Sequence, residues 1–207
     1  MTRYRSHSAR PRGFTMIEVL VSLLIIVLGL LGLAGLQVRI QQSEFESYQR
    51  AQALVLLQDM VERIHQHRVV AQCFRFTTDT ATGTPYLGAG ATATPSCSIS
   101  AVSNDNTQAV SSLGEWNTWL QGAAETKGGV AAGAMIGARG CVSYGAGTEL
   151  ENPPGTALPG TGIYTVAISW QGTIDTFAPT ENCANGLYGA ETRRRIVTTT
   201  FRLAQLR

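Results

Sequence analysis

The chain has 207 residues, enough for one ordinary domain plus an additional element, and its 44% hydrophobic and 14% charged residues exclude an intrinsically disordered chain. The formal net charge of +2 comes from four arginines that precede Gly13: Arg3, Arg5, Arg10 and Arg12. Removing these 4 from the 16 basic residues leaves 12 against 14 acidic residues. The rest of the chain therefore lacks the excess of positive charge that a general nucleic-acid-binding surface requires.

An apolar segment follows the arginines, and from Phe14 to Leu36 its only ionisable side chain is Glu18. About 20 apolar residues suffice for a helix to cross a bilayer. The basic flank predicts a cytoplasmic N-terminus, with everything after Leu36 outside the inner membrane. A secretory signal peptide is the alternative, and Ala34-Gly35 imitates its cleavage site. A signal peptide, however, has a shorter apolar core than this segment, and no helix continues beyond its cleavage site.

Glu18 is the most informative residue of this segment. A carboxylate within an apolar span costs roughly 2.5–3.5 kcal/mol and is usually functional. Cleavage after Gly13 would create an α-amine at Phe14, four residues before Glu18 and about one helical turn away. The new amine and the carboxylate would then neutralise each other, within one chain or between neighbouring chains.

Residues 12–20, Arg-Gly-Phe-Thr-Met-Ile-Glu-Val-Leu, resemble the class III signal of type IV prepilins and type II secretion pseudopilins. The resemblance implies that a prepilin peptidase cleaves between Gly13 and Phe14 and methylates the new N-terminal Phe14. It also matches Glu18 to the glutamate that this family uses in assembly. The motif covers only the first quarter of the chain. Three further stretches resemble the PilV-type minor pilins, or pilus modification proteins: residues 18–37, 164–172 and 194–197.

An amphipathic stripe at helical spacing continues the apolar segment, formed by Leu54, Leu57, Val61 and Ile64. Two acid-before-base pairs four residues apart, Glu46–Arg50 and Asp59–Arg63, favour the same helix. We predict a helix from Phe14 to about Arg68. The expected segments are a leader (1–13), a transmembrane assembly helix (14–36), its amphipathic continuation (37–70) and a periplasmic head domain (71–207).

The head domain is predicted to begin with a long surface connection, because residues 77–111 are rich in Thr, Ala, Gly, Ser and Asn. Ser112–Glu115 is a possible capping box that would start a short helix ending near Gly122. Alternating patterns predict strands over Ile163–Gln171 and Ile196–Leu203, with a third over Ala138–Tyr144. The predicted fold class is α+β: a long helix packed on a small antiparallel sheet, which is the type IV pilin fold.

Four cysteines follow the apolar segment: Cys73, Cys97, Cys141 and Cys183. An even number in an exported region predicts two disulfides, although buried free thiols remain the alternative. Of the three possible pairings we favour the sequential one, Cys73–Cys97 and Cys141–Cys183. The first would join the end of the helix to the long connection, and the second would tie the middle strand to the loop before the last strand.

The sequence offers no convincing catalytic site, and we expect no catalytic residue, metal or cofactor. Of the three histidines, His7 lies in the leader, and His65 and His67 lack the i,i+4 spacing of a zinc pair. The run Arg193–Arg195 is either a DNA-binding surface or a set of solvated strand positions. We do not expect nucleic acid as a partner, because phosphate contacts need cations clustered on one face.

The resemblance to PilV-type proteins implies a minor pilin that enters a type IV pilus and helps to initiate its assembly within a minor-pilin tip complex. The implied partners are the prepilin peptidase and N-methyltransferase, other minor pilins, the major pilin and the inner-membrane assembly platform. The subunit would first be a single-pass inner-membrane protein and then part of the pilus. A type II secretion pseudopilin is the closest alternative. A DNA-binding competence pilin and a membrane-anchored enzyme are more distant ones.

Overall fold

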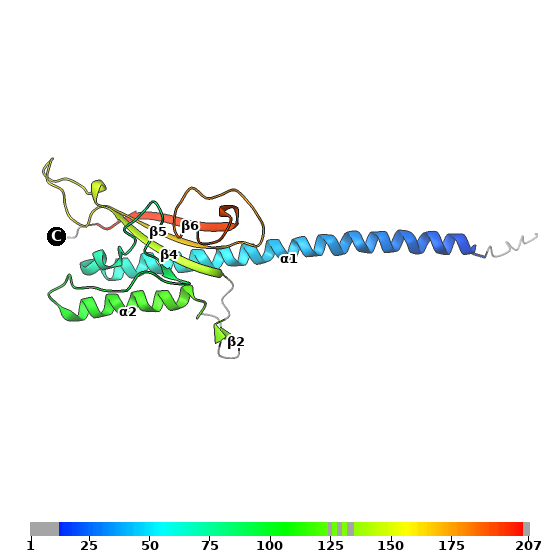
Figure 1. Ribbon diagram of the computed structural model, residues 1–207, viewed down its shortest axis with the longest axis horizontal. Coiled ribbons are helices and arrows are strands. Elements are labelled where there is room, and N and C mark those ends of the chain that lie inside the picture. Colours follow the sequence, from blue (N-terminus) through cyan, green and yellow to red (C-terminus); the bar gives the residue numbers. More distant parts are fainter. Residues whose placement is uncertain (1–12, 124–125, 128–129, 132–134, 205–207) are drawn as a thin grey trace, which may run out of the picture. The chain divides into compact units, whose positions relative to one another are not determined.

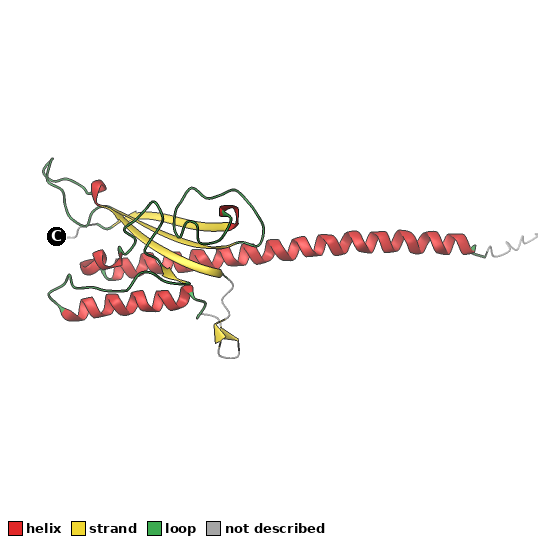
Figure 2. Ribbon diagram, in the orientation of Figure 1, coloured by secondary structure: helices red, strands yellow, loops and turns green. Residues whose placement is uncertain are grey.

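The computed structural model describes residues 13–123, 126–127, 130–131 and 135–204 (Figures 1 and 2). The chain divides into two compact units, Met1–Ser43 and Glu44–Arg207, and helix α1 runs through both. The four segments expected from the sequence remain a prediction.

The elements of the chain, in order, are α1 (Met16–Gln66), η1 (Arg68–Phe74), β1 (Leu87–Gly88), α2 (Ser103–Leu120), β2 (Thr126–Lys127), β3 (Val130–Ala131), β4 (Ile136–Gly145), η2 (Ala146–Thr148), β5 (Ile163–Gln171), η3 (Glu191–Arg193) and β6 (Arg194–Arg202). Four strands form an antiparallel sheet in the order β1-β4-β5-β6, and β2 pairs with β3. This confirms the predicted α+β, pilin-like architecture. Helix α1 and the three longer strands lie where their sequence periodicities placed them.

Helix α2 is longer than predicted, and the proposed capping box at Ser112 is wrong. The helix begins at Ser103, nine residues earlier, so Ser112 lies in its interior. The start is fixed by neighbouring side chains: the Ser100 hydroxyl accepts a hydrogen bond from Val102 N and donates one to Asp105. Asn106 binds the backbone of the preceding segment through Ile99 N and Ser100 N. Residues 103–111 are therefore helix rather than part of a surface connection.

The sheet of the head domain has strand β5 next to the edge strand β6. Nine residue pairs align β5 with β6, from Ile163–Arg202 to Gln171–Arg194. Strand β4 pairs with β5 in register except near its start, where the alignment shifts between Ile136 and Arg139. Gly137 lies in this irregularity with φ of +62°, a left-handed conformation that glycine adopts without steric cost.

Alternation along β5 builds a core on each face of the sheet. One set of buried side chains faces the helices: Tyr164, Val166, Ile168 and Trp170. They pack with the buried stripe of α1 and with α2. The opposite face contributes Ala167 and the neighbouring Cys141 to a smaller cluster that the loop residues Cys183, Ala184 and Tyr188 cover. The period of two in the sequence thus becomes two apolar layers.

Polar contacts join α2 to the C-terminal part of α1, which runs beside it (Figure 1). Trp116, fully buried, donates its indole N–H to Leu56 O at 2.9 Å. The Arg63 guanidinium pairs with Asp59 at 2.6 Å, as its i,i+4 spacing predicted, and with Glu115 of α2 at 3.0 Å. It also donates to the Ser112 hydroxyl at 2.9 Å. One buried cation therefore holds two helices together.

Gly140 is required where Trp116 packs on strand β4. A Cβ atom at Gly140 would lie 2.0 Å from Cη2 of Trp116, and this rigid ring cannot yield as a flexible chain would. We expect Gly140→Ala to lower the free energy of unfolding by about 1–3 kcal/mol through overpacking. Chemical denaturation followed by circular dichroism measures the change. The matched control is Gly114→Ala in α2, where no atom lies within 4 Å of the added methyl and helix propensity favours Ala by about 1 kcal/mol. Equal stabilities of the two variants would contradict this account.

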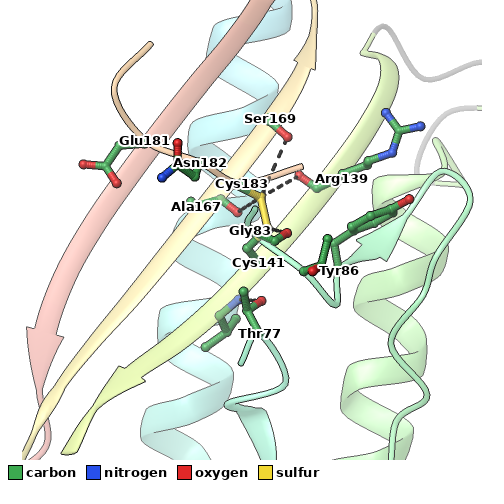
Figure 3. The surroundings of a disulfide bond; sticks show 12 residues. Thr77, Gly83, Tyr86, Arg139, Cys141, Ala167, Ser169, Glu181, Asn182 and Cys183 are labelled. Carbon is green, nitrogen blue, oxygen red and sulfur yellow. Dashed lines mark hydrogen bonds between the residues drawn. A yellow bond between two sulfur atoms is a disulfide. The ribbon is translucent and has the colours of Figure 1, made fainter. Parts of the chain in front are cut away.

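Disulfides join Cys73 to Cys97 and Cys141 to Cys183, the sequential pairs that the sequence favours. The second bond links the middle of β4 to the loop that covers the sheet (Figure 3). Cys141 and Cys183 are each 4% exposed, so this bond belongs to the smaller apolar cluster. Together the two bonds fasten the irregular stretches 89–102 and 172–190 to regular elements.

Candidate processing and assembly site

The first turn of α1 is closed by a reciprocal pair of side chains, Thr15 and Glu18. The Glu18 carboxylate accepts hydrogen bonds from the backbone N–H and the hydroxyl of Thr15, both at 2.9 Å. The Thr15 hydroxyl in turn accepts from Glu18 N at 3.4 Å. This is a capping box, which satisfies two backbone donors at a helix start. Its signature, Thr followed three residues later by Glu, is present in the sequence, although only Ser112–Glu115 was predicted to be a capping box.

The predicted cleavage junction lies immediately before this cap. Gly13, Phe14 and Thr15 precede α1, and the Phe14 side chain is 90% exposed. Among the residues that the structure describes, no atom lies within 4 Å of a Cβ built on Gly13, so none of them requires glycine there. The junction itself remains a prediction.

The apolar surface of α1 is uncovered beyond the cap. Large apolar side chains from Ile17 to Ile40 are between 47% and 65% exposed. Within the described residues, α1 is the helix long and apolar enough to cross a membrane. Such a surface is unstable in water and requires lipid or other apolar protein surfaces around it.

Comparison with known proteins identifies this N-terminal region. Residues 8–34 match the family model of the prokaryotic N-terminal methylation motif. This motif is typical of type IV pilin-like prepilins, so the chain has the N-terminal signature of a type IV pilin-like or pseudopilin precursor. The motif implies processing by a prepilin peptidase and a membrane and pilus context. No curated protein and no solved structure matches the chain.

The arginine run at the start of β6 forms internal ion pairs. Arg193 pairs with Asp175 at 3.0 Å, Arg194 with Glu191 at 2.6 Å, and Arg195 with Glu46 of α1 at 3.2 Å. The expected Glu46–Arg50 pair is thus replaced by a contact between α1 and the sheet. The sequence suggested either a DNA-binding surface or solvated strand positions for this run. Neither interpretation included these ion pairs.

The structure separates the predicted residues into two groups. Gly13, Phe14 and Glu18 lie together at the start of α1, whereas the four cysteines lie in the head. His65 and His67 contact the rings of Phe201 and Phe74 rather than each other. Among the residues with described positions, no three His, Cys, Asp or Glu side chains are grouped to hold a metal ion.

Proposed function

We propose that this chain is a minor pilin, cleaved between Gly13 and Phe14, methylated at Phe14 and incorporated into a type IV pilus. The observation that carries the proposal is the methylation motif at residues 8–34, which extends into helix α1, whose apolar side chains are exposed from Ile17 to Ile40. In the membrane, lipid covers this surface. In a filament, the corresponding helices of neighbouring subunits cover it, with the head domain outside.

Glu18 has two successive partners in this proposal. Before cleavage its carboxylate caps α1 through Thr15. After cleavage the α-amine of Phe14, from the same or a neighbouring chain, becomes available one turn away. A buried ion pair is favourable only when both partners are present. Burying Glu18 therefore costs less free energy where its carboxylate meets an amine. The carboxylate thereby guides docking of the subunit.

The finer role that we propose is the initiation of assembly within a tip complex of minor pilins. The resemblance of residues 18–37, 164–172 and 194–197 to PilV-type proteins supports it. The implied partners are other minor pilins, the major pilin and the inner-membrane platform. A few copies at the tip suffice for this role, whereas a shaft subunit is needed throughout the filament.

Mass spectrometry of sheared surface filaments tests the proposal. We expect an N-terminal peptide that begins with N-methylated Phe14, and far fewer copies of this chain than of the major pilin. A mature start at Met1 or near Leu36 would contradict the processing step. Amounts comparable to those of the major pilin would make the chain a shaft subunit. Recovery only from filaments of a secretion system would make it a pseudopilin.

A further inference from the structure

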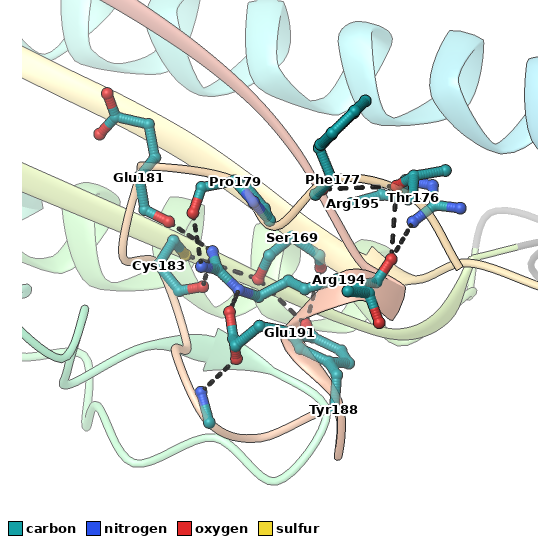
Figure 4. A network of polar contacts seen from close by, with 12 residues as sticks. Ser169, Thr176, Phe177, Pro179, Glu181, Cys183, Tyr188, Glu191, Arg194 and Arg195 are labelled. Atoms are coloured by element: carbon teal, nitrogen blue, oxygen red, sulfur yellow. Dashed lines mark hydrogen bonds and ion pairs between the residues drawn. The ribbon is translucent and has the colours of Figure 1, made fainter. Parts of the chain in front are cut away.

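The loop between β5 and β6, residues 172–193, displays large apolar side chains to solvent. Phe177 is 97% exposed, and Ile174 and Leu187 are 46% and 42% exposed. Large aromatic side chains dominate the energetics of protein interfaces, and Phe177 presents nearly its whole ring to a partner. Figure 4 shows the polar contacts around Phe177.

Arg194 fixes the part of the loop that follows Phe177. Its side chain is 1% exposed and points into the loop, where it donates hydrogen bonds to three backbone carbonyls (Figure 4). These are the carbonyls of Pro179, Glu181 and Cys183. The ion pair with Glu191 neutralises its charge at 2.6 Å, and the Cys183 disulfide adds a covalent attachment to β4.

Arg195 fixes the part of the loop that precedes Phe177. It donates to Ile174 O at 2.7 Å and to Thr192 O at 3.0 Å. Thr176 N also donates to Thr192 O, at 2.8 Å, so the residue next to Phe177 is bound to η3. Phe177 is therefore displayed by a segment held on both sides. A preorganised contact residue loses little conformational entropy when it binds.

The charges around the loop indicate what kind of surface would cover Phe177. Each of the three arginines lies beside a carboxylate, and the exposed Glu181 adds a further negative charge. A hydrogen bond from Arg193, followed by one from Thr192, lowers the pKa of Asp175, which keeps this carboxylate charged. DNA, RNA and anionic lipid require uncompensated cations. The complementary partner is an uncharged apolar surface.

We propose that Phe177 is a contact residue for the apolar surface of a second pilin-like subunit, and that Arg194 and Arg195 position it. This inference rests on the proposed function, because a filament brings such subunits together. A pilin-like partner offers such a surface on its own α1 before neighbouring helices cover it, as the exposed side chains of this chain's α1 illustrate. Phe177 and the apolar surface that receives it lie on different parts of a subunit. The contact is therefore heterologous and compatible with an open helical assembly. One phenylalanine buries only about 150–250 Å², so it acts as an anchor within a larger interface.

Site-specific photo-cross-linking in cells that produce the chain tests the contact directly. The full chain carries p-benzoyl-phenylalanine in place of Phe177, and the matched control carries it at Val69, which is 73% exposed in η1. We expect irradiation at position 177 to join the chain to a pilin-like subunit, with a much weaker product from position 69. Adducts with lipid alone, equal products from both positions, or no protein adduct would overturn the proposal.

Incorporation into filaments gives a second measurement. We expect Phe177→Ala to reduce the copies of the chain in sheared filaments about fivefold or more, as loss of an interface anchor does, and Val69→Ala to leave them unchanged. Because Phe177 is exposed, its replacement should not alter thermal unfolding. If the unmodified chain enters filaments and both variants match it, the role of Phe177 is wrong while the proposed function stands. If the unmodified chain is absent from filaments, the proposed function is wrong, and this inference, which rests on it, is wrong as well.

Discussion

Replacing Glu18 by alanine is expected to leave the chain inserted and cleaved but to reduce its incorporation into filaments by two orders of magnitude or more. Removing one partner of a buried ion pair costs about 3–5 kcal/mol, because the other charge stays buried and unpaired. Here the unpaired group would be the α-amine of Phe14. Quantitative mass spectrometry of membrane and filament fractions measures the ratio of the two populations.

The capping box provides the control for this experiment. Glu18→Ala also removes the hydrogen bonds to Thr15, so a loss of incorporation could arise from a weakened helix start. Thr15→Ala removes the capping hydroxyl but keeps the carboxylate, and a lost cap costs only about 1 kcal/mol. We therefore expect Thr15→Ala to be incorporated nearly normally. Equal defects in both variants would show that Glu18 acts through the cap rather than by pairing with an amine.

Loss of the Cys141–Cys183 disulfide should destabilise the head domain strongly. The bond closes a separation of 42 residues, for which the chain-entropy relation gives about 4 kcal/mol. For a protein of this length, the double variant Cys141→Ala with Cys183→Ala should lower Tm by roughly 10 °C. Circular dichroism during heating of the full chain in detergent measures this change.

The other disulfide is the matched comparison. Cys73–Cys97 closes 24 residues, so the same relation gives about 3.5 kcal/mol for its loss. Cys141 and Cys183 are buried whereas Cys73 and Cys97 are partly exposed, so cavities add to the cost only in the first case. The Cys141 and Cys183 variant should therefore be the less stable of the two. The reverse order would contradict the assignment of Cys141–Cys183 to a packed cluster.

The sequence predicted the elements whose periodicity is strong. The apolar run and the amphipathic stripe were both recognisable in the sequence, and one helix, α1, carries them. Strand β5 was recognisable because its alternation is regular. The first half of α2 was missed because Ser, Asn, Asp and Thr bind nearby backbone and favour turns in isolation. In the folded chain, contacts of Ser100 and Asn106 fix the start of α2, and Arg63 and Trp116 hold its later turns against α1.

The candidate site shows the same division between local and distant information. The cost of a carboxylate in an apolar segment was sufficient to single out Glu18. Its capping contact with Thr15 was also readable from local spacing but was overlooked. The partner of Arg195 was not readable, because Glu46 lies 149 residues before it and only the folded sheet brings them together.

The contacts that hold α1 in the head also determine how the head resists mechanical load. Between Glu46 and Arg63 the helix is attached sideways, through Arg195, through the indole of Trp116 and through Ser112. A tensile force applied along this stretch of helix would act across all these bonds at once, in shear, instead of opening them one after another. Bonds that share a load in parallel must break together, so the force for rupture is high even though each contact is weak. Under the proposed function, a filament under tension imposes this kind of pull on each of its subunits.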